Sequence, residues 1–172
     1  MAKPLDLADL QVYLSARIAP ARALGLSVEA ADPVIIAAPL EPNLNDKGTA
    51  FAGSLFSVAA LAGWMHVMRW CSLRSLDVEV ALQGASVQFV APARGAFRAS
   101  AGEPSVAQRD KLELLLARRG RGRIELPVEV NCEAKQVMKL TGVYAVTLSA
   151  IAKGSWPAAA TAAGDAGGAP LG

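Results

Sequence analysis

The sequence has very little cysteine and histidine. It contains two cysteines, Cys71 and Cys132, and one histidine, His66, among 172 residues. Two cysteines are too few for a disulfide framework, and these three residues do not have the spacing of a metal site. We therefore expect no metal, no cofactor, and two reduced, buried thiols.

The sequence also lacks an excess of either charge. It has 17 Lys and Arg residues against 15 Asp and Glu residues, so composition does not indicate a nucleic-acid partner. The first residues, "MAKPLDLADLQ", have no apolar segment of the kind found in secretion signals. With 53% hydrophobic residues in a chain of this length, we expect one globular, cytoplasmic domain.

Between Lys47 and Arg69 no residue carries a full charge. The run is long enough to span a bilayer. However, it includes glycines, hydroxyl groups and a histidine, there is no second such run, and the flanking segments have the pattern of amphipathic strands. A helix that is apolar on every side is equally typical of one buried in a soluble protein. We favour the buried helix.

Hydrophobic periodicity predicts the order of the elements along the chain. We expect helices over 5–18, 51–71 and 105–119, and strands over 24–30, 34–40, 77–90, 97–101, 122–135 and 137–150. Pro20 is expected to end the first helix. Several one-sided antiparallel strands and one helix that is apolar all round are best accommodated if the sheet wraps the helix. We therefore predict an α+β hotdog fold, with five to six strands, over residues 1–153. The tail 154–172 is rich in Ala, Gly and Pro, and we expect it to be disordered.

Two residues indicate irregularities in the strands. The apolar alternation of 77–90 changes phase near Gly84, which predicts a bulge or a sharp bend. Pro127 lies on the polar side of the alternating segment "GRIELPVEVNCEAK", which predicts an edge position or a bulge.

The stretch "NLNDKGTAFAGS", which leads into the apolar helix, is the best candidate for a site. Gly48 and Gly53 allow sharp turns and close approach of the backbone to a ligand. Asn45 supplies an amide and Thr49 a hydroxyl group, and the start of a helix presents free N–H groups near Ala52. Such groups suit a developing oxyanion, as on the carbonyl of a thioester. The alternative, which the sequence leaves open, is that the asparagines only build a turn and Ser54 caps the helix.

The segment "PLEPNLNDKGTAFAGSLFSVAALAGW" resembles the YiiD-C-terminal-type hotdog family of thioesterases and standalone malonyl-acyl-carrier-protein decarboxylases. The resemblance runs from about Leu7 to Ile151, with "RRGRGRIELPVEV" as a second matching stretch. It implies a homodimer of hotdog subunits with the substrate pocket at the interface. It also implies that the ligands are acyl thioesters linked to phosphopantetheine, carried by acyl carrier protein or CoA.

The sequence departs from the broader thioesterase hotdogs at two points. Those proteins have Asn-x-x-Gly followed by His-Gly-Gly, whereas here Asn45 and Gly48 match but Phe51 begins the second motif. Many of them also have an acid within the helix, where this chain has Ala60. Hydrolysis needs a base, whereas decarboxylation of a malonyl thioester does not. We therefore predict conversion of malonyl- to acetyl-acyl carrier protein at the start of fatty acid synthesis. Hydrolysis of acyl-CoA or acyl carrier protein is the alternative, and a non-catalytic acyl-thioester-binding hotdog is the third possibility.

The resemblance and the residue chemistry together assign expected roles. The decarboxylase branch gives the critical role to the loop asparagine, which corresponds to Asn45 and would polarise the thioester carbonyl or hold the leaving carboxylate. Thr49 and the N–H groups near Gly53 would complete the polar site, and Asp46 would be the base only in a thioesterase. We expect the remaining substrate contacts at Gly48, Phe51, Ala52, Ser54, Phe56 and Trp64, although the aromatic residues fit an ordinary core equally well.

The segment "ARRGRGR" contains four arginines, Arg118, Arg119, Arg121 and Arg123. If the substrate is tethered to the acidic acyl carrier protein, this cluster is a docking surface or a contact for the phosphate of pantetheine. A solvated turn is the alternative, and a nucleic-acid contact is the least favoured. A Ser57–His66–Asp77 triad is excluded, because about 100° per residue puts Ser57 and His66 on opposite faces of one helix.

Overall fold

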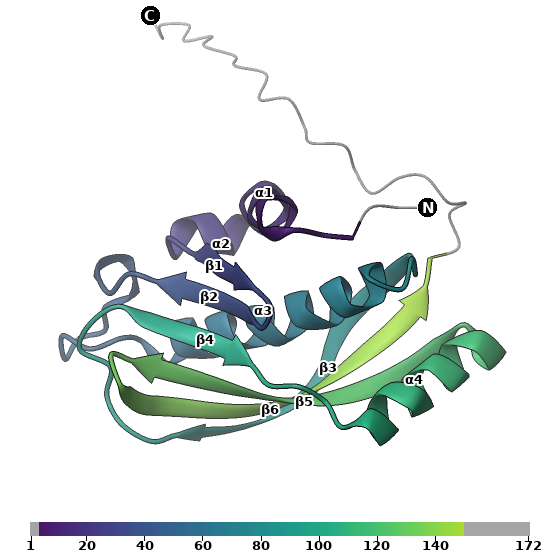
Figure 1. The fold of residues 1–172 in the computed structure, drawn as a ribbon. Helices are drawn as coiled ribbons and strands as arrows, with labels where there is room; N and C mark the ends of the chain where they lie inside the picture. The colour runs from purple at the N-terminus through teal and green to yellow at the C-terminus, as the bar shows by residue number, and fades with distance from the viewer. Residues whose placement is uncertain (1–3, 150–172) are drawn as a thin grey trace, which may run out of the picture.

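The structure is a computed structural model that describes residues 4–149. The predicted tail lies outside the described residues. In chain order the elements are α1 (Leu7–Arg17), α2 (Ala19–Ala23), β1 (Ser27–Ala31), β2 (Val34–Ala38), the 3₁₀ helix η1 (Glu41–Asn43), α3 (Ala52–Ser72), β3 (Val78–Phe89), β4 (Phe97–Ala101), α4 (Val106–Arg119), β5 (Arg121–Cys132) and β6 (Lys135–Leu148) (Figure 1).

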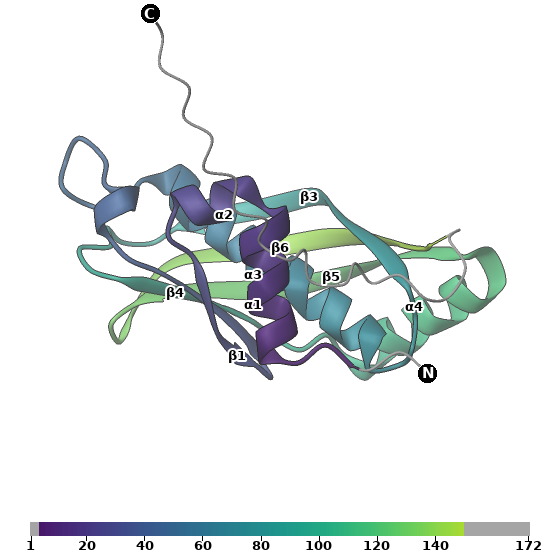
Figure 2. The same cartoon turned by 90° about the horizontal axis from the view of Figure 1, so that it is seen from above.

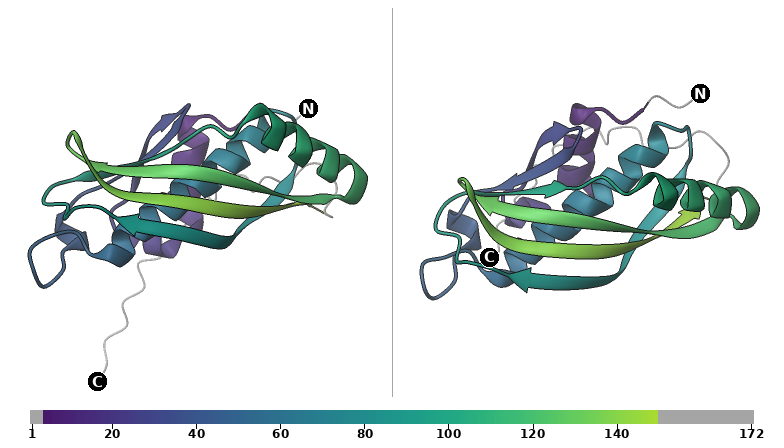
Figure 3. Two further views of the ribbon diagram at one scale, coloured as in Figure 1. Left: turned by 90° about the horizontal axis from the view of Figure 1, so that it is seen from below. Right: turned by 60° about the horizontal axis from the view of Figure 1, so that its bottom comes forward.

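All six strands form one antiparallel sheet in the order β1-β2-β4-β5-β6-β3. The long helix α3 lies against one side of this sheet, which curves around it (Figures 1 and 3). Seen from above, α1 crosses over α3, and the rings of Tyr13 and Trp64 are 5.4 Å apart (Figure 2). The predicted hotdog arrangement is confirmed.

The helix α3 is buried on several sides, as its sequence predicted. Its buried residues are Ser54, Leu55, Val58, Ala59, Ala62, Gly63, Met65, His66, Val67, Met68, Trp70 and Cys71. Small residues let the sheet approach closely. A Cβ atom at Gly63, for instance, would collide with the hydroxyl group of Tyr144 on β6. Within residues 4–149, no helix combines the length and hydrophobicity needed to cross a membrane.

The first helix differs from its prediction at both ends. Asp6 caps α1 through a capping box with Asp9, so the helix begins at Leu7 rather than at residue 5. Pro20 was expected to end this helix but lies in the first turn of α2. Proline suits that position because its missing N–H would have no helical partner there.

Strand β5 has the predicted alternation, with Ile124, Leu126, Val128, Val130 and Cys132 buried and the residues between them more exposed. The edge position predicted for Pro127 is confirmed locally, because β4 pairs only with residues 128–132 of β5, whereas the bulge of this strand lies elsewhere, at Val130–Asn131. The C=O of Pro127 accepts from the N–H of Gly102, one residue beyond the end of β4. Its missing N–H therefore faces a strand that has already ended. Along this half of β5, α4 takes the place of a neighbouring strand, with Leu112 and Leu116 buried.

Strand β3 forms one edge of the sheet and has the predicted irregularity, a register shift between Leu82 and Gly84. The N–H of Leu148 on β6 donates to the carbonyl of Gly120, the residue directly before β5. Every second residue of an antiparallel strand directs its backbone N–H and C=O to the same side, so those of Val146 also point toward β5. Its partner Val80 on β3 must then direct its backbone groups to the open edge.

Side chains from helices contact both edges of the sheet. The indole N–H of Trp64 on α3 donates to the carbonyl of Val80 on β3, with an N···O distance of 2.7 Å. On the opposite edge, the N–H of Val28 on β1 donates to the side-chain carbonyl of Gln11 on α1, also at 2.7 Å. Each edge therefore has one backbone group satisfied by a helix.

Candidate functional site

The candidate loop is a tight turn between η1 and α3. The N–H of Asn45 donates to the carbonyl of Thr49 at 2.8 Å, and the N–H of Gly48 donates to the carbonyl of Asn45 at 3.2 Å. Leu44 and Ala50 form an isolated antiparallel bridge around it. Gly48 has φ 68°, in the left-handed region that favours glycine. The backbone therefore folds back on itself immediately before α3.

The side chain of Asn45 organises this turn. Its Oδ1 accepts from the N–H of Lys47 at 2.8 Å and from the N–H of Thr49 at 3.1 Å. Its Nδ2 donates to Thr49 Oγ1 at 2.9 Å and, at 3.4 Å, to the carbonyl of Ala50. The second of these Nδ2 bonds is long, which makes it the weaker of the two. Asn45 thus has the structural role left open by the sequence, with one donor hydrogen weakly held.

The hydroxyl group of Thr49 has a proton that it can donate in a hydrogen bond. Its side chain is buried, and its Oγ1 already accepts from Asn45. A hydroxyl has one proton to donate, and within residues 4–149 no acceptor for it is present. The geometry therefore directs the Asn45 amide and the Thr49 hydroxyl toward each other, with the Thr49 proton left over.

The start of α3 supplies further donors. Phe51 is its N-cap residue, and no side chain caps the helix. The N–H groups of Ser54 and Leu55 donate to the carbonyl of Phe51, whereas those of Ala52 and Gly53 have no partner in the described part of the chain. Ser54 lies inside the helix and is buried, so the alternative in which it caps α3 is wrong.

Asn43 is a positioning residue that sequence reasoning underestimated. It is almost fully buried, and its Nδ2 donates to the carbonyls of Leu24 at 2.9 Å and Pro39 at 2.7 Å. Its own carbonyl accepts from the N–H of Phe51 at 2.7 Å. Through its side chain and its backbone carbonyl together, this one residue connects the approach to β1, the end of β2 and the start of α3. An asparagine in a polar stretch gives no sequence signal of such long-range bonds.

The only acid in the loop, Asp46, is exposed and forms an ion pair with the adjacent Lys47 at 2.7 Å. No other carboxylate occurs between it and Asp77. The aromatic residues do not form one chamber within this chain. Phe51 is 55% exposed, with its ring over Gly53, and Phe56 is half-buried. Trp64 is held by Tyr13 and Val80.

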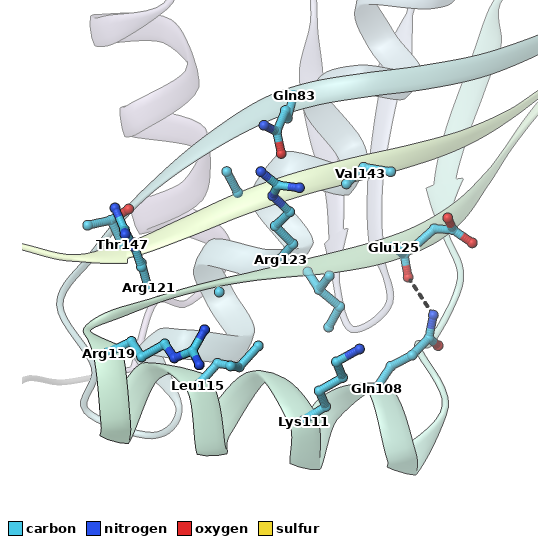
Figure 4. A pocket seen from close by; sticks show the side chains of 13 residues that line it. Gln83, Gln108, Lys111, Leu115, Arg119, Arg121, Arg123, Glu125, Val143 and Thr147 are labelled. Atoms are coloured by element: carbon cyan, nitrogen blue, oxygen red, sulfur yellow. Dashed lines mark hydrogen bonds between the residues drawn. The ribbon is translucent and has the colours of Figure 1, made fainter.

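Three of the four predicted arginines line a groove of about 720 Å³ between α4 and the strands β5, β6 and β3 (Figure 4). These are Arg119, Arg121 and Arg123, and Lys111 on α4 joins them, whereas Arg118 does not line the groove. Glu125 is the only acid in the lining. Within residues 4–149, none of these four cations has an ion pair or a side-chain hydrogen bond.

A second hollow, of about 310 Å³, lies near the C-terminal half of α3 and includes His66, Arg69 and Trp70. The Nε2 atom of His66 lies 3.4 Å from a carboxylate oxygen of Glu103. Burial lowers the pKa of His66, and the carboxylate of Glu103 opposes this shift. Among the residues described here, no group of three or more His, Cys, Asp or Glu side chains could hold a metal ion. Neither hollow includes a residue of the loop 43–54.

Comparison with known structures places the fold in the hotdog class of thioesterases. A protein of unknown function from Chlorobaculum tepidum TLS is 27% identical, with a TM-score of 0.77, over 85% of this chain and 99% of the other. A putative thioesterase from Shewanella oneidensis is 25% identical, with a TM-score of 0.73, over 83% and 97% of the two chains. A probable thioesterase from Pseudomonas aeruginosa, 22% identical, has the same fold, with a TM-score of 0.73 over 87% and 100% of the two chains.

The family described as "Putative thioesterase (yiiD_Cterm)" matches residues 7–148, and the chain belongs to this family. The resemblance inferred from the loop sequence is therefore confirmed. No match was found among curated proteins.

Proposed function

We propose that this protein decarboxylates malonyl-acyl carrier protein to acetyl-acyl carrier protein. The observation that carries the proposal is a loop that combines neutral hydrogen-bond donors with no buried carboxylate. The donors are the Thr49 hydroxyl, the Nδ2 hydrogen of Asn45 that forms the long bond to Ala50, and the free N–H groups of Ala52 and Gly53. Asp46, the one nearby acid, is exposed and paired with Lys47.

These groups match the charge that develops in the reaction. When the bond between the α-carbon and the carboxylate breaks, its electron pair moves into the thioester carbonyl and carbon dioxide leaves. The resulting enolate oxygen carries the negative charge, which neutral donors stabilise in a water-poor site. A proton from solvent then completes the acetyl group at the α-carbon. No step requires a base in the protein.

Hydrolysis is the second candidate, and the description of the family favours it. It would need a base to activate water. Asp46 is the only loop residue in this chain that could act in that way, and it would first have to leave its ion pair with Lys47. The two reactions therefore depend on different side chains of the same loop.

We further propose that the working unit is a homodimer joined along β3. The twelve residues of β3 form an edge strand, and an unpaired edge favours addition of another strand. Large exposed hydrophobic residues lie at its end, with Phe89 and Val90 each 52% exposed, and Phe51 is exposed on the adjoining loop. The N–H of Ala50 donates to the carbonyl of Ala93 at 2.8 Å, which keeps the loop beside this edge. A second copy would cover these exposed residues and complete an acyl pocket beside the loop.

The groove of unpaired cations supports a carrier-protein substrate. Acyl carrier proteins are acidic, and opposite charge steers association and fixes orientation. Lys111, Arg119, Arg121 and Arg123 present four cations against the single acid Glu125. We propose this groove as the docking surface.

The deciding experiment incubates the protein with malonyl-acyl carrier protein and with a set of acyl-CoA and acyl-carrier-protein thioesters. Carbon dioxide and free thiol are measured separately. Carbon dioxide without thiol is the expected result, and thiol without carbon dioxide would instead establish hydrolysis. In the decarboxylase, Asn45→Ala reduces turnover and Asp46→Ala does not. The reverse order would mean that a carboxylate base drives the reaction.

A further inference from the structure

The candidate loop and the cationic groove lie at opposite ends of the same sheet. The loop adjoins the end of β3, where the N–H of Val90 donates to the carbonyl of Val137 at the start of β6. The groove adjoins the other end of β6, where Ala145 and Thr147 pair with Arg123 and Arg121. From Val137 to Ala145 an extended strand covers about 26 Å at roughly 3.3 Å per residue. Within one protomer, the two features are therefore far apart.

A dimer paired along β3 changes this relationship. If two copies of β3 pair antiparallel about a two-fold axis through the segment beyond the bulge, the end of β3 in the partner lies beside the middle of β3 in this chain, near Gly84. Gly84 of β3 pairs with Val143 of β6, which pairs with Glu125 of β5. Three strand spacings, about 14 Å in all, then separate the end of the partner's β3 from the groove. The nearer loop is the one in the partner.

We propose that each basic groove docks the carrier protein that delivers its thioester to the loop of the other protomer. This inference rests on the proposed function and adds one point to it. Docking and chemistry take place on different protomers of the dimer, an arrangement called trans below, whereas in a cis arrangement both would take place on the same protomer. The groove supplies Lys111, Arg119, Arg121 and Arg123, and the loop of the partner subunit supplies the donors for the thioester. A site of this kind is incomplete in a single chain, in agreement with the absence of loop residues from the groove.

The charges of the groove fit a docking role better than a structural one. Four cations close together repel one another, and within residues 4–149 no acid side chain forms an ion pair with any of them. Other exposed arginines of the same chain are neutralised, for example Arg98 by Glu29 at 2.6 Å and Arg74 by Glu113 at 2.6 Å. An acidic partner would supply the counter-charges that the groove lacks.

The test uses dimers made of two different protomers, co-expressed with two tags and purified on both. One protomer carries Asn45→Ala and the other carries Arg119→Glu with Arg121→Glu. In the trans arrangement, the intact loop of the arginine variant works with the intact groove of the Asn45 variant. We expect this mixed dimer to recover about half of the wild-type turnover of malonyl-acyl carrier protein, whereas each variant homodimer is strongly impaired.

The reciprocal mixed dimer is the matched control. It combines one wild-type protomer with one that carries all three substitutions. In trans this dimer has no complete site and stays impaired, whereas in cis it retains half of the wild-type activity. Impairment of the first mixed dimer together with half activity of the second would overturn the proposal. Unchanged activity of the Arg119→Glu, Arg121→Glu homodimer would also overturn it, and an inactive wild-type protein would instead refute the proposed function.

Discussion

The hydroxyl group of Tyr144 donates a hydrogen bond of 3.2 Å to the carbonyl oxygen of Ala60, in the middle of α3. The ring of Tyr144 is fully buried and lies where a side chain at Gly63 would project. Burial also raises the pKa of the Tyr144 phenol, so the group remains a neutral donor at all ordinary pH values. This contact fixes the distance between the central helix and β6.

We predict that Gly63→Ala destabilises the protein, because the added methyl group has no space beside Tyr144. The cost of such overpacking is about 1–3 kcal/mol and exceeds the gain in helix propensity. Urea denaturation measures the change in the free energy of unfolding. Gly84→Ala is the matched control, because nothing lies within 4 Å of the added atom, and its effect is expected within about 0.5 kcal/mol. Equal stability of the two variants would contradict the close contact.

The hydroxyl group of Thr49 can be tested apart from the shape of its side chain. Thr49→Val keeps the shape but removes the proton that has no acceptor among residues 4–149. We expect kcat to fall by about 100-fold, typical of the loss of one oxyanion donor. Thr49→Ser retains the hydroxyl and is expected to keep most of the activity. If valine and serine behave alike, the hydroxyl is not a donor in the reaction.

The proposed dimer predicts an effect of charge at the end of β3. Phe89→Asp places a carboxylate where the second copy would lie, and sedimentation is expected to show a monomer. Phe89 is 52% exposed, so the fold itself should keep its melting temperature to within a few degrees. Val106→Asp, which changes an exposed residue on α4, is the control and is expected to leave the dimer intact. A dimer in both variants would exclude this interface.

The single histidine makes the pH dependence of stability easy to assign. His66 faces Glu103, with Asp32, Arg69 and Arg109 around it, and burial lowers its pKa. As the pH falls, the histidine of the unfolded chain therefore takes up a proton before that of the folded chain. The contribution of neutral His66 to the free energy of unfolding is complete above about pH 6.5 and is lost as the pH decreases below this value. The slope from one group is at most about 1.4 kcal/mol per pH unit.

Replacement of this residue isolates its contribution. We expect the free energy of unfolding of His66→Gln to change less between pH 7 and pH 5 than that of the wild type. Denaturation curves at several pH values give both slopes. A variant with the same slope as the wild type would assign the pH dependence to other groups.

The thiol of Cys71 is expected to be unreactive in the folded protein. Burial raises its pKa to about 12, so almost no thiolate is present at pH 8. Cys132 is also buried. A thiol reagent should label neither cysteine rapidly in native protein and both in urea. Fast labelling of Cys71 in native protein, identified by peptide mapping, would show that the core around it opens readily.

The fold could be predicted because local patterns and long-range packing agreed. The alternation around Ile124 predicts a strand with one buried face, and the uncharged run after Lys47 predicts a buried helix. In one small chain, the two are best combined by a sheet that wraps the helix. The phase change at Gly84 located a bulge for the same reason. Pro127 correctly indicated an edge, but the neighbour that is missing there could not be predicted, because it depends on where a different strand, β4, ends. Sequence pattern along one strand carries no such information.

The candidate site was predicted only in part. The polar loop and its glycine were identified from composition, and the turn around Asn45 has the form that was left open as an alternative. The role of Asn43 could not be predicted, because its partners Leu24 and Pro39 are brought together by tertiary structure. Similarly, nothing in the sequence indicates that Lys111 lies beside Arg121 and Arg123.

The hydrogen bond from Trp64 to Val80 also bears on solubility. An open sheet edge is a hazard because further chains can add to it without limit. Here Trp64 occupies an acceptor near the start of β3, and Gln11 occupies a donor on β1 at the other edge. Beyond the bulge at Gly84, no side chain in the described part of the chain donates to or accepts from the backbone of β3. The same two side chains that hold helices to the sheet thus each remove one backbone group from the set that another strand could pair with.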